Sequence, residues 1–135
     1  MTTRRACPKP APRSKQPRRT RPVEEVLDLV RARCMGRCER CATPFFGRNG
    51  GDPHHRRPRG MGGSRDPRLN QPSGIVALCR SCHDHIENQR TAAEVDGWLV
   101  SKAADLPRIP IRSRLHGLVL LADDGTTIEP KEATA

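Results

Sequence analysis

The apolar positions along the chain predict a few short elements separated by polar stretches. Residues 23–33 carry apolar side chains at helical spacing, with glutamates in the first turn and arginines in the last, and therefore predict a helix. The apolar run 75–78 predicts a short strand, and the stretch 79–89 predicts a cysteine knuckle that leads into a second helix. A turn-rich loop over 42–53 is expected to precede a short polar extended segment over 54–57.

The last third of the chain predicts one more helix and a hairpin. Thr91 is the expected N-cap of this helix, and Glu94 three residues later would complete a capping box. The helix is expected to carry three apolar residues, Val95, Trp98 and Leu99. Residues 115–128 predict an antiparallel hairpin with its turn at Asp124–Gly125.

The composition limits how such elements are held together. The chain has 135 residues, which predicts one domain plus loose ends, and only 34% of them are hydrophobic. A chain with so few hydrophobic residues buries only a small core, and a small core usually needs additional stabilisation, such as a bound metal ion. The sequence has neither an apolar run long enough for a membrane span nor an apolar stretch behind its basic N-terminus. We therefore expect a cytoplasmic protein without membrane contact, whose six cysteines bind metal rather than form disulfides.

The net charge of +10 is concentrated at one end of the chain. Residues 1–22 hold eight basic residues, five prolines and no acidic residue, so residues 23–135 carry a net charge of only +2. This composition predicts a disordered tail. A basic tail attracts nucleic-acid phosphates without sequence preference, and the alternative is a tail that serves solubility alone.

Two CxxC pairs predict a structural zinc site. Cys38 and Cys41 form one pair and Cys79 and Cys82 the other, and two such turns supply the four sulfurs of a tetrahedral zinc. Cys34 lies four residues before Cys38 and is a competing ligand. The alternative is a redox CxxC, which needs no second pair and for which the surrounding βαβ pattern is missing here. Zinc binding contributes on the order of 10 kcal/mol to folding, enough to replace a missing apolar core.

Three histidines lie beside these cysteines. His54 and His55 are neighbours on a presumed strand, so their side chains point to opposite faces. If the knuckle packs on that strand, His54 and His83 converge on a second metal ion, and His55 remains as a base. Imidazole titrates near neutrality and can take a proton from water. The alternative is a pair of ordinary surface histidines.

The joint pattern HHRRPRGMGG, Asn70 and CRSCH resembles the HNH endonuclease family, and more narrowly the small HNH proteins of phages, over about residues 36–90. The resemblance implies a small α+β fold of the ββα-metal type, stapled by zinc. It implies that His55 is the general base, that Asn70 orients His55, and that His83 binds the catalytic metal. His54 lies where the family has an Asp or a His that binds this metal.

The resemblance leaves some positions open. His85 lies where the phage proteins are expected to carry a bulky aromatic residue. Glu87 lies four residues after His83 on the same helix face, and it either approaches the metal or makes a cap, a salt bridge or an outer contact. The alternative for Asn70 is an ordinary turn residue. Five arginines near the site are expected to bind DNA phosphates: Arg56, Arg57, Arg59, Arg65 and Arg68. The alternative is that they lie in a solvated loop without a role in DNA binding.

The sequence thus predicts a DNA endonuclease, a hydrolase of phosphodiester bonds. Its expected cofactors are a structural Zn²⁺ and a catalytic Mg²⁺, Mn²⁺, Ni²⁺ or Zn²⁺. The predicted organisation is a tail over 1–22, a nuclease domain over 23–101 and a C-terminal extension over 102–135. The resemblance further implies a phage-encoded protein in the host cytoplasm. A further alternative, with the same nuclease site, is an accessory packaging factor that works with phage terminase subunits. The alternative function is a non-catalytic zinc-ribbon DNA-binding protein.

Overall fold

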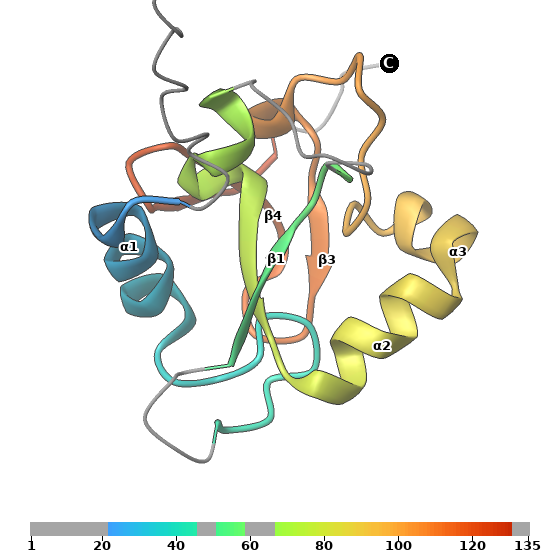
Figure 1. Ribbon diagram of the computed structural model, residues 1–135, viewed down its shortest axis with the longest axis horizontal. Coiled ribbons are helices and arrows are strands. Elements are labelled where there is room, and N and C mark those ends of the chain that lie inside the picture. The colour runs from blue at the N-terminus through green and yellow to red at the C-terminus, as the bar shows by residue number, and fades with distance from the viewer. Residues whose placement is uncertain (1–21, 46–50, 59–66, 131–135) are drawn as a thin grey trace, which may run out of the picture.

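The computed structural model describes residues 22–45, 51–58 and 67–130 and has an α+β fold. The predicted tail therefore lies almost entirely outside the described residues. Figure 1 shows the helices α1 (Glu24–Cys34), α2 (Arg80–Asn88) and α3 (Arg90–Val95). The strands are β1 (Asp52–His55), β2 (Ile75–Leu78), β3 (Ile111–Ser113), β4 (Gly117–Leu121) and β5 (Thr127–Ile128). Three 3₁₀ turns complete the described elements: η1 (Pro67–Asn70), η2 (Pro72–Gly74) and η3 (Leu106–Arg108).

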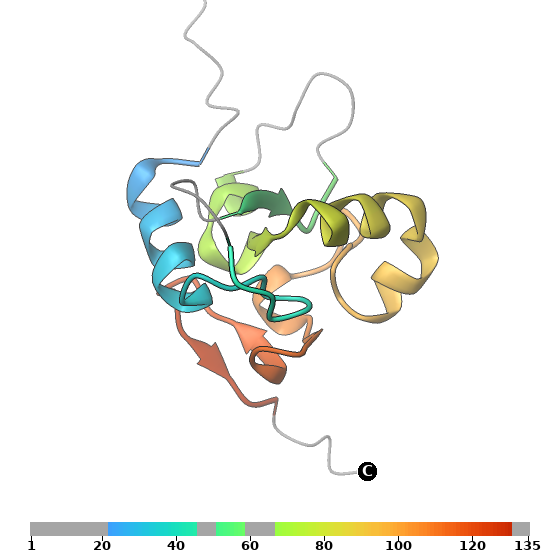
Figure 2. The ribbon, with the colours of Figure 1, turned by 90° about the horizontal axis from the view of Figure 1, so that it is seen from below.

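The centre of the fold is the antiparallel pair β1–β2 followed by α2. In this pair His54 lies opposite Val76, and His55 lies opposite Ile75. Helix α1 covers one side of the pair, and α2 and α3 lie on the other side (Figures 1 and 2). This order of two strands and a helix is the predicted ββα unit.

Strand β2 is buried on both faces, which explains why its sequence is a continuous apolar run. Ile75 and Ala77 pack in one cluster with Val26 and Val30 of α1. The intervening side chains of β2 belong to the larger cluster on the opposite face. Because successive strand residues alternate in direction, four apolar residues fill two separate cores.

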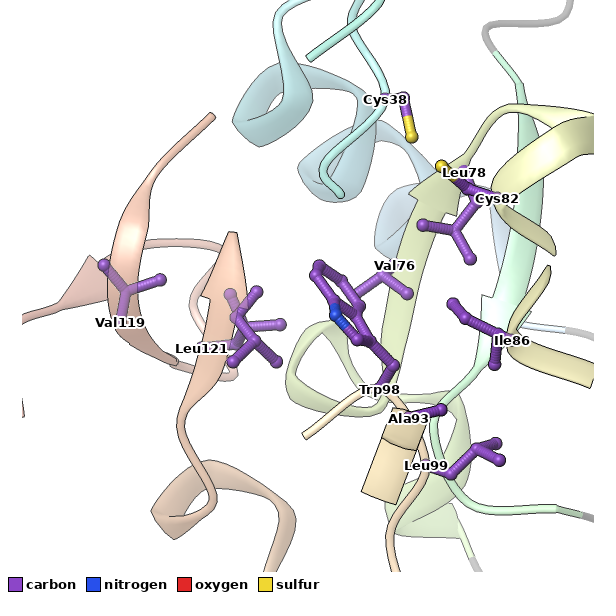
Figure 3. Close-up of a cluster of buried hydrophobic side chains, with 11 residues drawn as sticks. Cys38, Val76, Leu78, Cys82, Ile86, Ala93, Trp98, Leu99, Val119 and Leu121 are labelled. Atoms are coloured by element: carbon purple, nitrogen blue, oxygen red, sulfur yellow. The ribbon is translucent and has the colours of Figure 1, made fainter. Parts of the chain in front are cut away.

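The C-terminal strands complete the larger cluster. Strands β3, β4 and β5 form an antiparallel sheet in that order. Figure 3 shows Trp98 between Val76 of β2 and Leu121 of β4, and Ile111 of β3 belongs to the same cluster. Trp98 is 1% exposed, so this single tryptophan is the largest group that joins the ββα unit to the C-terminal sheet.

Most predicted elements are confirmed, and the third helix is corrected. Helix α1, strand β2, helix α2 and the hairpin β4–β5 match their predicted ranges within a few residues. Helix α3, however, begins at Arg90 and is preceded by Gln89, whose side chain makes no capping bond. It ends before Trp98 because Gly97 has a φ of +82° and lies against the carbonyl of Pro110, where a Cβ would come within 2.0 Å. The chain turns there and directs Trp98 into the core.

A buried ion network fixes the first cysteine knuckle. Glu39 is fully buried and accepts hydrogen bonds from Arg33 Nε (2.6 Å), Ala77 N (2.8 Å) and His116 Nε2 (3.1 Å). Burial alone would raise the pKa of the Glu39 carboxyl, but the bonds from His116 and Arg33 outweigh it and hold this pKa below its usual range. The network ties the knuckle to α1, β2 and the C-terminal sheet.

None of the helices in the described part of the chain combines the length and the apolar character that crossing a membrane requires.

Candidate metal centres

The four predicted zinc ligands lie together. The sulfurs of Cys38, Cys41, Cys79 and Cys82 all lie within 4.8 Å of one another. Cys41 Sγ and Cys79 Sγ are 3.8 Å apart, and four sulfurs at roughly 2.3 Å from a zinc ion form a tetrahedron with edges of about 3.8 Å. Cys34 is not in this group, because it is buried in the α1 cluster and its thiol donates to the carbonyl of Arg31. The geometry fits a structural zinc.

Local structure aims these sulfurs at one point. The first pair lies in a tight turn closed by bonds from Cys38 N to Thr43 O and from Ala42 N to Cys38 O. Cys79 is the N-cap of α2, and its sulfur accepts from Cys82 N at 3.5 Å. The first pair thus comes from a turn and the second from a helix start.

The thiols differ in how readily they ionise. Burial raises the pKa of Cys38, and it raises the pKa of Cys82 to about 12. At Cys41 burial acts in the same direction, but hydrogen bonds from the side chain and backbone of Thr43 outweigh it and lower the pKa to about 6. Arg40 Nη1 donates to Cys82 Sγ at 3.4 Å and favours its thiolate. A zinc ion bound here would therefore have to displace protons from the buried thiols.

A second group of potential ligands lies between β1 and α2. One ligand atom each of His54, His83 and Glu87 lies within 4.8 Å of the others, and the rings of His54 and His83 have centroids 5.2 Å apart in an edge-to-face arrangement. His83 and Glu87 share one face of α2 because they are four residues apart. Of the alternatives for Glu87, the structure shows both proximity to the two histidines and an exposed ion pair with Arg90 at 3.5 Å.

The environment of His54 would suit a metal ligand. Its Nε2 lies 3.2 Å from the carbonyl oxygen of Trp98, so Nε2 carries the proton and Nδ1 carries the lone pair. Burial, together with the nearby charge of His83, lowers the pKa of His54 to about 4. A neutral imidazole whose tautomer is fixed by a backbone carbonyl is the usual form of a metal-binding histidine.

His55 is held by Asn70. Its Nε2 lies 2.9 Å from Asn70 Oδ1, and since an amide oxygen only accepts, Nε2 donates and Nδ1 carries the lone pair. Asn70 ends η1 and His55 ends β1, so this bond joins the two ends of the loop between β1 and η1. It sets the orientation of the His55 ring.

A match to a known protein family bears on this arrangement of four cysteines, three histidines and a ββα unit. Residues 38–89 match the family model described as HNH endonuclease. This central segment of the chain is similar to an HNH endonuclease domain. No curated protein matches the chain, and no solved structure does. The HNH segment spans both cysteine pairs, the ββα unit and His54, His55 and His83.

One expected phosphate contact is wrong. Arg56 is 0% exposed, and its guanidinium donates to the carbonyls of Ser73 (2.7 Å), Gly97 (2.9 Å), Leu106 (3.3 Å) and Ile109 (2.7 Å). Burial lowers the pKa of Arg56 to about 10. The burial of Arg56 is consistent with the alternation of side chains along a strand. Arg56 lies two residues after the buried His54 and therefore on the same face.

The other arginines have different positions. Arg57 is 5% exposed and donates to the carbonyl of Ala104, so its guanidinium is also directed into the protein. Arg68 is exposed on η1, beside Asn70. Arg59 and Arg65 lie outside the described residues. Of the described arginines in this set, only Arg68 is exposed enough to meet a phosphate of bound DNA.

Proposed function

We propose that this protein is a metal-dependent endonuclease that hydrolyses DNA phosphodiester bonds. The HNH domain supports nuclease activity in general. The observation that carries the specific proposal is the approach of His54, His83 and Glu87 to within 4.8 Å, next to a histidine held by Asn70. A zinc ribbon that only binds DNA has no use for this group.

The chain's own residues have separate tasks in this proposal. His55 takes a proton from the attacking water at Nδ1, since Asn70 keeps the proton of the resting ring on Nε2. The water oxygen forms a bond to phosphorus while the bond to the 3′-oxygen breaks, which leaves 5′-phosphate and 3′-hydroxyl ends. The leaving oxygen takes its proton from solvent.

Two imidazoles and one carboxylate suit Mn²⁺, Ni²⁺ or Zn²⁺ better than an all-oxygen site would, and they also admit Mg²⁺. His54, His83 and Glu87 would hold the ion. A divalent cation bound there would neutralise charge on the scissile phosphate and on the departing oxygen. The half-exposed face of His83 and the exposed Glu87 leave this group open to a substrate.

The test is cleavage of supercoiled plasmid by zinc-loaded protein with added Mg²⁺, Mn²⁺ or Ni²⁺. We expect His55→Ala to reduce the cleavage rate by at least 100-fold, since general-base catalysis contributes roughly 10²–10⁴-fold. Zinc content and DNA affinity should stay at the wild-type level. His83→Ala should reduce cleavage and also weaken binding of the added metal.

Two results would contradict the proposal. Wild-type protein that binds DNA but leaves the plasmid intact with every metal would indicate the non-catalytic zinc-ribbon alternative. Cleavage retained in His55→Ala would remove this residue from the mechanism.

A finer proposal concerns the biological setting. The run HHRRPRGMGG resembles small phage HNH proteins, which supports a phage-encoded enzyme that acts with terminase in genome packaging. A pull-down of purified large and small terminase subunits with the full chain tests it. Absence of binding to either subunit would refute this setting and leave the nuclease proposal unaffected.

A further inference from the structure

Asp52 lies beside the proposed metal ligands, and no reasoning from sequence had singled it out. It opens β1 two residues before His54, so both side chains lie on the same face of the strand. Its sheet partner is Leu78, the last residue of β2, which places Asp52 at the start of α2. Asp52 Oδ2 lies 3.6 Å from His83 Nδ1 and 3.5 Å from Arg80 Nη1.

His83 has a nitrogen that the rest of the fold leaves unused. Its Nδ1 is buried and has no hydrogen-bond partner among the described residues. The carboxylate at 3.6 Å is slightly beyond hydrogen-bond range. Asp52 is 43% exposed, so a small side-chain rotation is enough to close the gap.

Asp52 is not itself in the ligand group. The atoms of His54, His83 and Glu87 lie within 4.8 Å of one another, and Asp52 falls outside that set. Ligands on opposite sides of an octahedral ion are roughly 4.2 Å apart at bond lengths of about 2.1 Å. The carboxylate is therefore too far away to share the ion with all three residues, although it does face His83.

We propose that Asp52 is a positioning residue for the metal site: its carboxylate accepts a hydrogen bond from His83 Nδ1–H and so directs Nε2 of His83 toward His54 and Glu87. This inference rests on the proposed nuclease function. A carboxylate behind a metal-binding histidine fixes its tautomer and increases its basicity. His54 already has such a partner in the carbonyl of Trp98, and Asp52 would supply the second.

The first measurement is binding of Ni²⁺ to the full chain with zinc already bound, by calorimetry. We expect Asp52→Asn to weaken Ni²⁺ binding by roughly 10–100-fold, the usual effect of losing such a partner. Asp84→Asn is the matched control, because Asp84 is an exposed carboxylate on α2 that pairs with the same Arg80 at 3.4 Å. It removes the same charge and should change the affinity less than about 3-fold.

The second measurement determines the tautomer of His83 and needs no added metal. Long-range ¹H–¹⁵N spectra of the zinc-loaded protein should show the proton of neutral His83 on Nδ1, the minor tautomer of free histidine. Asp52→Asn should shift this proton toward Nε2. In a His83→Ala background, Asp52→Asn should cause no further loss of Ni²⁺ affinity. This non-additivity separates a role through His83 from general electrostatics.

Wild-type Ni²⁺ affinity in Asp52→Asn, or a proton on Nε2 of His83 in the wild-type protein, would overturn the inference. Equal losses in Asp52→Asn and Asp84→Asn would also overturn it, because charge alone would then explain the effect. If Asp52→Asn behaves as expected but the wild-type protein cuts no DNA, the nuclease proposal fails and the positioning role remains.

Discussion

Replacing Arg56 by methionine tests whether this residue supports the fold or grips DNA. The guanidinium is fully buried and donates to four backbone carbonyls, from Ser73, Gly97, Leu106 and Ile109. These carbonyls belong to three separate segments that lie 17 to 53 residues away along the chain. Methionine fills a similar volume and donates no hydrogen bond.

Two opposing effects set the size of the loss. A buried acceptor left without its donor costs about 1–3 kcal/mol, so four carbonyls lose roughly 4–12 kcal/mol together. Removing a buried charge returns several kcal/mol of desolvation free energy. We expect the carbonyls to dominate, with a net loss of at least about 3 kcal/mol in the free energy of unfolding. That loss lowers the melting temperature by on the order of 10 °C.

The assay is denaturant unfolding of the zinc-loaded protein, followed by DNA binding at several salt concentrations. Arg68→Met is the control, since Arg68 is exposed and the loss of an exposed contact should change stability by at most about 1 kcal/mol. If Arg68 meets a phosphate, its replacement lowers the salt dependence of DNA binding by about one ion. An Arg56→Met protein with wild-type stability but weakened DNA binding would refute the structural role.

Two further predictions concern the groups that hold the fold together. Glu39→Gln should destabilise the protein by roughly 3–5 kcal/mol at pH 7, because it leaves the buried Arg33 without its carboxylate. The pKa of Glu39 is depressed in the folded state. The difference in the free energy of unfolding between wild type and variant is therefore largest above the ordinary pKa of 4.5, and it is lost as pH falls through the lower folded pKa. Denaturant unfolding between pH 3 and pH 7 measures it, and a pH-independent difference would contradict the assignment. Removing zinc with a strong chelator should unfold the domain, since the metal contributes on the order of 10 kcal/mol. Far-UV circular dichroism should show loss of helix that added Zn²⁺ restores, and a folded zinc-free protein would contradict it.

The sequence was most informative where chemistry depends on local spacing. Each CxxC pair closes within one turn, so the pattern alone predicted four sulfurs that the structure brings within 4.8 Å. The helical spacing of His83 and Glu87 likewise placed both on one face of α2. Strand β2 was predictable because a short, continuous apolar run is typical of a strand that is buried on both faces.

Contacts between distant segments were beyond the reach of sequence. From sequence, an arginine in a basic loop is expected to contact phosphate. Only the packing of residues 97–109 against β1 makes Arg56 a hydrogen-bond donor to buried backbone carbonyls. The approach of Asp52 to His83 depends on the register of β1 with β2, and the pairing of Glu39 with His116 depends on where the C-terminal sheet packs. Residue type and spacing thus determined which chemistry the chain can support. The tertiary structure decided which polar groups face that chemistry and which are buried, because burial is a property of the packed chain and not of any single segment.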